Sequence, residues 1–316
     1  MMVVHDLEQI GYDKNSVVTV GTFDGVHRGH EIVIREIVER AKKRGGRSVV
    51  VTFDPHPRKV LRRQEESIQL LSTLTDRTTF CRSLEVDVFF IIQFSYDFSR
   101  QSFREFYLRY VVHGIGVSEV VEGYDHHFGR DREGSIETLL QLGKEFEFGV
   151  HAIQPVCVDG APVSSSGIRS WLLIGNVERA ARMLGRLYGI SGSVVRGDGR
   201  GKYLGYPTAN LQLVNNEQLV PQNGIYFVEV RRGSERHFGM ASIGVRPTFG
   251  QDGRRTIEVN ILDFDGDLYE EILELRFIKR LRDELKYDRV EDLINQMHKD
   301  KEESLRLRAM MNETKN

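Results

Sequence analysis

The sequence has very little cysteine. Cys81 and Cys157 are its only two cysteines in 316 residues, and neither lies in a Cys-x-x-Cys or Cys/His pattern. A disulfide framework needs several paired cysteines, and a structural zinc site needs clustered cysteine or histidine ligands, so the sequence favours neither. We expect a protein of a reducing compartment, the cytoplasm.

Long apolar segments are also missing. No stretch reaches the roughly 18 consecutive apolar residues of a membrane-spanning helix. Residues 1–15 contain several acidic side chains and lack the apolar core that a secretory signal needs. We therefore expect neither a signal peptide nor a membrane partner.

The sequence has no excess of positive charge. Lys and Arg number 44 against 46 Asp and Glu, a formal net charge of -2, and the balance is nearly even in both halves of the chain. Proteins that bind nucleic acids usually carry a basic face, so we expect no nucleic-acid partner.

The hydrophobic content of 40% is enough for ordinary cores. The length favours two domains over one.

The first half alternates between two kinds of segment. Short apolar, β-branched runs, typical of strands buried in a parallel sheet, lie at residues 17–20, 48–53, 86–92, 117–121 and 148–153. Segments with helical periodicity lie between them, at residues 31–43, 76–84, 103–112 and 136–144. This order predicts a doubly wound α/β domain, whose ligand binds beyond the carboxyl ends of the strands.

The second half has a different pattern. A helix over residues 175–184, with Asn176 as its cap, precedes a series of strands at residues 189–196, 224–231, 236–245, 256–264 and 272–277. Turn residues separate these strands, and a last helix spans about residues 290–310. We predict an antiparallel barrel or sandwich closed by a terminal helix. The predicted domains are residues 1–185 and 186–316.

The sequence Gly-Thr-Phe-Asp-Gly-Val-His-Arg-Gly-His, residues 21–30, lies between the first strand and the first helix of this pattern. Its glycines allow close approach of a ligand to the backbone, and the start of the helix offers unpaired N–H groups to an anion. His27 and His30, three residues apart, share a helix face and could donate hydrogen bonds to phosphate. A turn with solvated histidines is the simpler alternative. Zinc is disfavoured because a helical histidine pair for zinc usually spans four residues.

This run resembles the HxGH signature of the nucleotidylyltransferases. With Phe23, Asp24 and Gly25 before the histidines, it is similar to the adenylyltransferase module of bacterial bifunctional riboflavin kinase/FAD synthetases. Three further segments follow the order of that family: Thr-Phe-Asp-Pro-His-Pro at 52–57, Gly-Tyr-Asp-His-His-Phe-Gly at 123–129 and Ser-Ser-Ser-Gly-Ile-Arg at 164–169. The resemblance covers about residues 17–300.

The resemblance implies a Rossmann-like nucleotidylyltransferase domain in which FMN attacks the α-phosphorus of ATP and pyrophosphate leaves. His27, His30 and Arg169 would neutralise charge during this transfer, and Asp125 would contact the flavin. The implied nucleotide-binding residues are Gly21, Phe23, Asp24, Gly29 and Ser165. For Ser164 and Ser166, an ordinary helix cap remains an equal alternative.

The second half resembles riboflavin kinase in its glycine-rich run of residues 197–210, which ends in Pro-Thr-Ala-Asn. The resemblance implies that Thr208 and Asn210 hold Mg²⁺, for which oxygen ligands are suited. Glu258 would be the base that accepts a proton from riboflavin. The implied nucleotide contacts are Gly199, Gly201, Lys202 and Thr208, and the implied flavin contacts are Arg282 and Glu284.

Three positions depart from the family pattern. His126 replaces an aromatic residue, Ser166 replaces threonine, and Asn260 stands where many members have histidine. None of these changes removes a residue that the implied chemistry requires. The leading hypothesis is a bifunctional Mg²⁺- and ATP-dependent enzyme that acts on riboflavin and FMN, forms FAD, and is a monomer or weak oligomer. The alternatives are a riboflavin kinase with a silent adenylyltransferase module, and a non-catalytic flavin- or nucleotide-binding regulator.

Overall fold

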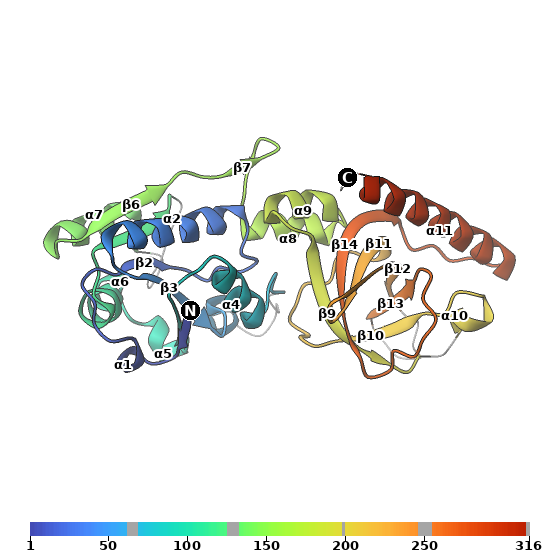
Figure 1. Cartoon of the computed structure of the whole chain (residues 1–316), viewed down its shortest axis with the longest axis horizontal. Helices are drawn as coiled ribbons and strands as arrows, with labels where there is room; N and C mark the ends of the chain where they lie inside the picture. The colour runs from blue at the N-terminus through green and yellow to red at the C-terminus, as the bar shows by residue number, and fades with distance from the viewer. Residues whose placement is uncertain (62–68, 125–132, 198–199, 246–254, 314–316) are drawn as a thin grey trace. The chain divides into compact units, whose positions relative to one another are not determined.

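A computed structural model describes residues 1–61, 69–124, 133–197, 200–245 and 255–313 (Figure 1). Contacts divide the chain into two compact units, Met1–Ser165 and Ser166–Asn316. This division falls before the predicted domain boundary near residue 186, and α9 (Val177–Leu184) contacts strands of the second unit. The boundary between the two activities stays a prediction.

Unit 1 contains a six-stranded parallel sheet in the order β1-β4-β3-β2-β5-β6. The five predicted strands are confirmed, and the edge strand β1 is an addition that is too short to have a recognisable pattern. The strands are β1 (Met2–Val4), β2 (Val17–Val20), β3 (Ser48–Asp54), β4 (Val88–Gln93), β5 (Glu119–Gly123) and β6 (Gly149–Ile153). A small hairpin, β7 (Cys157–Val158) and β8 (Ala161–Pro162), follows the sheet.

Helices cover both faces of this sheet (Figure 1). They are α1 (Leu7–Ile10), α2 (Arg28–Arg44), α3 (Pro57–Leu61), α4 (Leu74–Ser83), α5 (Tyr96–Ser99), α6 (Phe103–Phe106) with the π-helix η1 (Tyr107–Ile115), and α7 (Ile136–Glu145). Two apolar clusters form, one with α2 and α4, the other with α6, η1 and α7. The doubly wound prediction is confirmed.

Unit 2 is a closed antiparallel barrel in the order β10-β13-β12-β11-β14-β9. Its strands are β9 (Tyr188–Val195), β10 (Ala209–Leu213), β11 (Gly224–Arg232), β12 (Glu235–Val245), β13 (Arg255–Ile261) and β14 (Ile272–Arg282). Its helices are α8 (Ser165–Leu173), α9 with the predicted Asn176 cap, the short α10 (Arg200–Tyr203) and the terminal α11 (Val290–Glu313). The barrel and the terminal helix are confirmed. No helix within the described ranges is long and apolar enough to cross a membrane.

The strand order of the parallel sheet reverses between β2 and β5. From β2 the chain order continues through β3 on one side, and from β5 it continues to β6 on the other. The described pairing covers Val17 and Val18, opposite Glu119 and Val120. Further along, the Val20 N–H donates to Glu122 Oε1 at 2.7 Å instead of to a strand carbonyl. A side chain thus replaces a ladder acceptor at the point where doubly wound proteins bind ligands.

Glu122 is only 2% exposed. Burial raises the pKa of its carboxyl group well above the usual range, although hydrogen bonds from Val20 and Thr19 oppose the shift. The folded protein therefore keeps a proton on Glu122 that the unfolded chain releases above its ordinary pKa of about 4.5. For that reason the contribution of Glu122 to stability is largest at low pH and is lost as the pH rises toward the folded pKa.

Replacing Glu122 with glutamine should raise the melting temperature at pH 7–8, because glutamine resembles the neutral acid and releases no proton on unfolding. The gain should shrink toward pH 4, and each unit of pKa difference corresponds to about 1.4 kcal/mol. Thermal unfolding across this pH range provides the measurement.

Glu119→Gln is the matched control: burial raises the pKa of Glu119, but hydrogen bonds from Arg40 and Arg44 produce a net lowering. This variant should lose stability at pH 7. A Glu122→Gln variant less stable than the parent at pH 8 would contradict the neutral carboxyl.

The terminal helix α11 is attached to the barrel by an ion pair between the partly buried Arg282 and the buried Asp300. Arg282 at the end of β14 contacts both carboxylate oxygens of Asp300, with Nε at 3.0 Å from each and Nη2 at 2.8 Å from Oδ2. Gln296 Nε2 donates to the same carboxylate at 2.9 Å. Apolar side chains of α11, including Leu305, pack on a barrel cluster beside this pair. The ion pair and the apolar contacts together position the helix.

Asp300→Ala should lower the free energy of unfolding of the barrel unit by about 3 kcal/mol, because it leaves the Arg282 guanidinium without its buried counter-charge. Chemical denaturation provides the measurement. Glu302→Ala, which removes an exposed acid from the same helix, should change stability by less than about 0.5 kcal/mol. Equal losses in the two variants would show that the Asp300 pair has no special role.

Candidate functional site

The loop after β2 brings the two predicted histidines together. His27 is the N-cap of α2, and its Nδ1 accepts from the His30 N–H at 3.3 Å. The two rings stack with centroids 3.6 Å apart and an interplanar angle of 17°. A Cβ on Gly29 would lie 3.2 Å from His27 Nδ1, so a side chain there would crowd the stack. Because Nδ1 accepts, Nε2 carries the proton of the neutral His27 ring and can donate to an anion.

The backbone of this loop adopts uncommon conformations. Phe23 and Val26 have φ angles of 48° and 34°, although neither is glycine. Both side chains are buried, and the Phe23 ring contacts His30 edge to face at 5.2 Å. Such conformations persist only where surrounding contacts enforce them. The position of the two histidines therefore depends on contacts between this loop and the residues packed around it.

Asp24 provides part of this support. Its carboxylate is 2% exposed and accepts from the backbone N–H groups of Leu71 and Ser72. The Ser72 hydroxyl in turn accepts from the Gly25 N–H at 2.7 Å. Ser165, from the predicted second phosphate motif, donates to the Asp24 carbonyl at 2.9 Å. The two motifs thus meet, while the Asp24 carboxylate is engaged by protein groups. The predicted contacts of Gly21, Phe23, Asp24, Gly29 and Ser165 with a nucleotide stay predictions.

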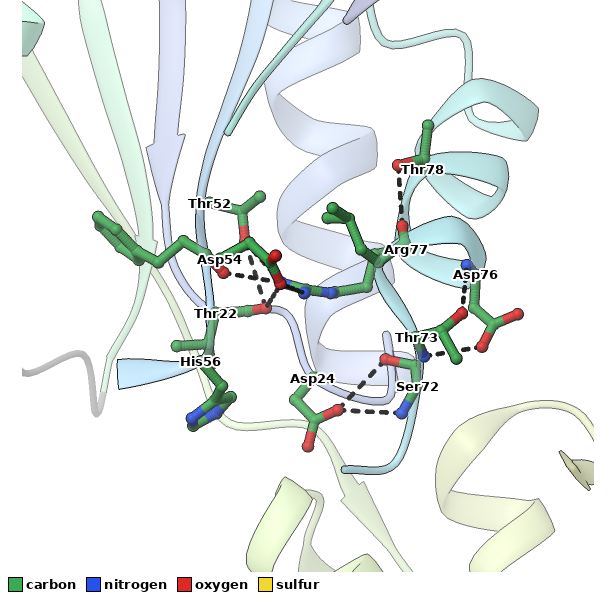
Figure 2. A network of polar contacts seen from close by, with 12 residues as sticks. Thr22, Asp24, Thr52, Asp54, His56, Ser72, Thr73, Asp76, Arg77 and Thr78 are labelled. Atoms are coloured by element: carbon green, nitrogen blue, oxygen red, sulfur yellow. Dashed lines mark hydrogen bonds and ion pairs between the residues drawn. The ribbon is translucent and has the colours of Figure 1, made fainter. Parts of the chain in front are cut away.

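A buried arginine lies beneath the same edge of the sheet. Figure 2 shows Arg77 of α4 in a polar network with Thr22, Thr52 and Asp54, which follow or end strands β2 and β3. His56, also drawn there, is buried and its Nδ1 accepts from the Arg58 N–H at 3.2 Å. The sequence analysis missed both Arg77 and Glu122. Two features of the sequence could have indicated them: Arg77 lies at a core-facing position of a helix, and Glu122 lies in a strand of β-branched residues.

The barrel brings together the three central residues of the predicted kinase site. Thr208 Oγ1 donates to Glu258 Oε2 at 3.1 Å. Asn210 of β10 lies directly opposite Glu258 of β13 in the antiparallel ladder. Gly197 contributes space, because a Cβ there would lie 2.1 Å from Asn210 Nδ2. All three side chains are half-buried.

The chemistry of this group suits a hard cation. A hydroxyl, an amide and a carboxylate offer oxygen ligands of the kind that Mg²⁺ prefers beside phosphates. Gly201 lies close by, since a Cβ there would be 3.2 Å from Thr208 Oγ1. A pocket beside Thr208 is lined by residues 205–207, residues 260–265 and Lys301. Asn260 stands at its edge and donates to the Pro207 carbonyl at 2.8 Å.

Several predicted site residues are not among the two groups of residues described above, or lie outside the residues that the structure describes. Arg282 forms the ion pair with Asp300, and the Glu284 carboxylate lies against Gly244 of β12. Arg169 lies on α8, in the second unit. Asp125, His126 and Gly199, together with the Lys202 side chain, lie outside the described residues. Their predicted roles, and those of Arg169, Arg282 and Glu284, stay predictions.

Two family models match the chain, one in each half. FAD synthetase matches residues 9–167, and riboflavin kinase matches residues 184–307. The first match contains the segments 21–30, 52–57 and 123–129 and ends within 164–169, and the second contains the run 197–210 and Glu258.

Several relatives match this chain over nearly its whole length, so the matches include both halves. A Listeria monocytogenes protein named bifunctional riboflavin kinase/FMN adenylyltransferase is 37% identical over 292 residues, 92% of each chain. A Bacillus subtilis protein of the same name is 35% identical, also over 92% of each. A crystal structure from Streptococcus pneumoniae, described as a macrolide-efflux protein, has a TM-score of 0.86 and 32% identity and covers 95% of this chain and 97% of its own. With both family models matched and such relatives spanning nearly its whole length, the chain belongs to the bifunctional riboflavin kinase/FMN adenylyltransferase family.

Proposed function

We propose that this chain makes FAD from riboflavin in two steps. The barrel unit transfers the γ-phosphoryl group of ATP to riboflavin and yields FMN and ADP. The N-terminal unit then transfers the AMP portion of a second ATP to FMN and yields FAD and pyrophosphate. The observation that carries the proposal is the convergence of three side chains: Asn210 lies opposite Glu258 on paired strands, and Thr208, just before β10, donates to Glu258. The stacked pair of His27 and His30 supports the second step.

In the kinase step, Glu258 is the general base. It accepts the proton of the ribityl hydroxyl as that oxygen bonds to the γ-phosphorus, while the bond to the bridging oxygen breaks and ADP leaves. The hydrogen bond from Thr208 holds one oxygen of Glu258 and so limits its rotation. Thr208 and Asn210 would hold Mg²⁺, which supplies positive charge to the phosphates. Gly199, Gly201 and Lys202 would surround the nucleotide.

In the adenylyl step, the FMN phosphate is already ionised and needs no base. One of its oxygens attacks the α-phosphorus, and the bond to pyrophosphate breaks. The protein positions the two anions and stabilises charge. His27 Nε2–H, His30 and the N-terminus of α2 supply donors at one place. Arg169 would add a forked cation from α8, and Asp125 a contact to the flavin.

The partners proposed are small molecules: riboflavin, FMN, FAD and ATP. The nearly neutral sequence supports the absence of a nucleic-acid partner. Cys81 is buried and Cys157 is exposed, and both are free thiols, which fits a cytoplasmic protein. A monomer or weak oligomer is the proposed state.

Glu258→Gln should lower FMN formation from riboflavin by about 100-fold or more, because amides are poor proton acceptors. The same variant should convert supplied FMN to FAD at the parent rate. The measurement is chromatography of flavins over time, with riboflavin or FMN as substrate and with ATP and Mg²⁺. Glu274→Gln, another strand glutamate of the barrel, is the control and should retain both activities. Loss of both steps in folded Glu258→Gln would contradict the division of labour.

His27→Asn combined with His30→Gln should stop the reaction at FMN. Asparagine keeps a side-chain acceptor at the N-cap of α2, so the variant removes the imidazoles with little effect on the helix. FAD formation should fall about 100-fold or more, since each lost donor destabilises the charged transition state. His5→Gln, at an exposed position of the same unit, should behave as the parent. A parent protein that forms FMN and no FAD would instead support the alternative of a silent N-terminal module.

A further inference from the structure

We propose that Arg77 is a positioning residue for adenylyl transfer, which holds in one fixed arrangement the end of β3 and the loop after β2 that leads to the histidine pair. The proposal rests on the proposed function of the N-terminal unit. Arg77 is 2% exposed, although it carries a large and charged side chain. A buried guanidinium needs a compensating set of acceptors, and the nature of those acceptors indicates its role.

The acceptors of Arg77 come from the ends of two neighbouring strands. Nη1 donates to the Thr22 carbonyl at 2.9 Å, to Thr52 Oγ1 at 3.0 Å and to the Phe53 carbonyl at 3.3 Å. Nη2 lies 3.4 Å from Asp54 Oδ1. Figure 2 shows the guanidinium between these groups, with Thr52 also donating to the Thr22 carbonyl at 3.3 Å. One side chain therefore joins the segments that follow β2 and end β3.

Arg77 acts where the sheet can no longer join these segments. The described pairing of β2 with β3 runs to Val20 opposite Val51, and the Gly21 N–H extends it to the Val51 carbonyl at 3.0 Å. The next residue of the loop is Thr22, whose carbonyl Arg77 binds. Arg77 thus continues the attachment between the strands by one further residue, immediately before Phe23 and its positive φ angle.

The helix that carries Arg77 is itself attached to the histidine loop. Leu71 and Ser72, just before α4, bind the Asp24 carboxylate. Thr73 then caps the helix through a capping box with Asp76. The loop is thus held at Asp24 by the entrance to α4 and at Thr22 by Arg77, on either side of Phe23. This two-point attachment is what a strained loop requires to keep one conformation.

The geometry demands arginine rather than any cation. A planar guanidinium presents several N–H groups to acceptors in different directions, whereas a lysine ammonium is a single point on a flexible stem. Burial lowers the pKa of Arg77, and the nearby charges of Asp24 and Asp54 oppose this shift. Charge alone would survive Arg77→Lys, but the simultaneous hold on Thr22, Phe53 and Asp54 would not. This difference separates positioning from simple charge compensation.

Arg77→Lys tests the proposal in the full-length protein. We expect kcat for FAD formation from FMN and ATP to fall by roughly 10- to 100-fold, because small displacements of positioning groups are costly. KM for ATP should change less than kcat. FMN formation from riboflavin in the same preparation should be unchanged, which controls for the barrel unit, and an unchanged circular dichroism spectrum should show that the first unit is folded. Arg82→Lys, an exposed residue of the same helix, is the matched control and should retain both activities.

Thr52→Val provides a second route that leaves the charge in place. It removes the hydroxyl that Arg77 and the Thr22 carbonyl share, with little change of shape, and should lower the same kcat by a smaller factor. The double variant should lose less than the product of the two single losses, because both act on one network. Normal FAD formation in Arg77→Lys, multiplicative losses in the double variant, or an equal loss of FMN formation would each overturn the proposal. A parent protein that forms no FAD would refute the proposed function instead.

Discussion

Backbone groups at the carboxyl edge of the parallel sheet must find partners where the strand ladder ends. Inside the sheet N–H and C=O groups are satisfied by neighbouring strands, but at this edge the pairing of β2 with β5 stops after Val18. Buried side chains take over the missing partners. Glu122 binds the Val20 N–H, Arg77 binds the Thr22 and Phe53 carbonyls, and Asp24 binds the N–H groups before α4. The end of the strand pairing and the strained loop after β2 both depend on these side-chain hydrogen bonds.

The barrel meets the same constraint in another way. Closure of its six strands removes free edges, so the ladder itself can place the polar groups of the proposed kinase site. Asn210 and Glu258 face one another because their strands pair in that register, and Thr208 lies just before the same strand. Gly197 leaves the space into which the Asn210 amide fits. Here the site depends on regular structure and on a missing side chain, while in the N-terminal unit it depends on buried polar groups.

This contrast accounts for what the sequence could predict. Hydrophobic periodicity located five of the six strands, β2 to β6, and the principal helices of the first unit, because each segment must bury a continuous apolar face whatever its neighbours are. Spacing placed His27 and His30 on one face, and the stacked rings confirm it. Arg77 and Glu122 could not be recognised in this way. Their function depends on partners at Thr22 and Val20, distant in sequence, and a lone charged residue in a helix or strand is usually exposed.

The near neutrality of the chain follows from the same division of work. A protein that recruits polyanions through a surface needs many basic side chains, whose mutual repulsion must be balanced. In this chain, backbone N–H groups at the start of α2 lie beside two stacked imidazoles, and the oxygen-bearing side chains of the proposed kinase site lie together in the barrel. Partial burial strengthens electrostatic interactions of such groups, because less water screens them. The proposed phosphate transfer then needs no excess of basic side chains, and a buried charge such as Arg77 can instead hold the loop that carries the histidines.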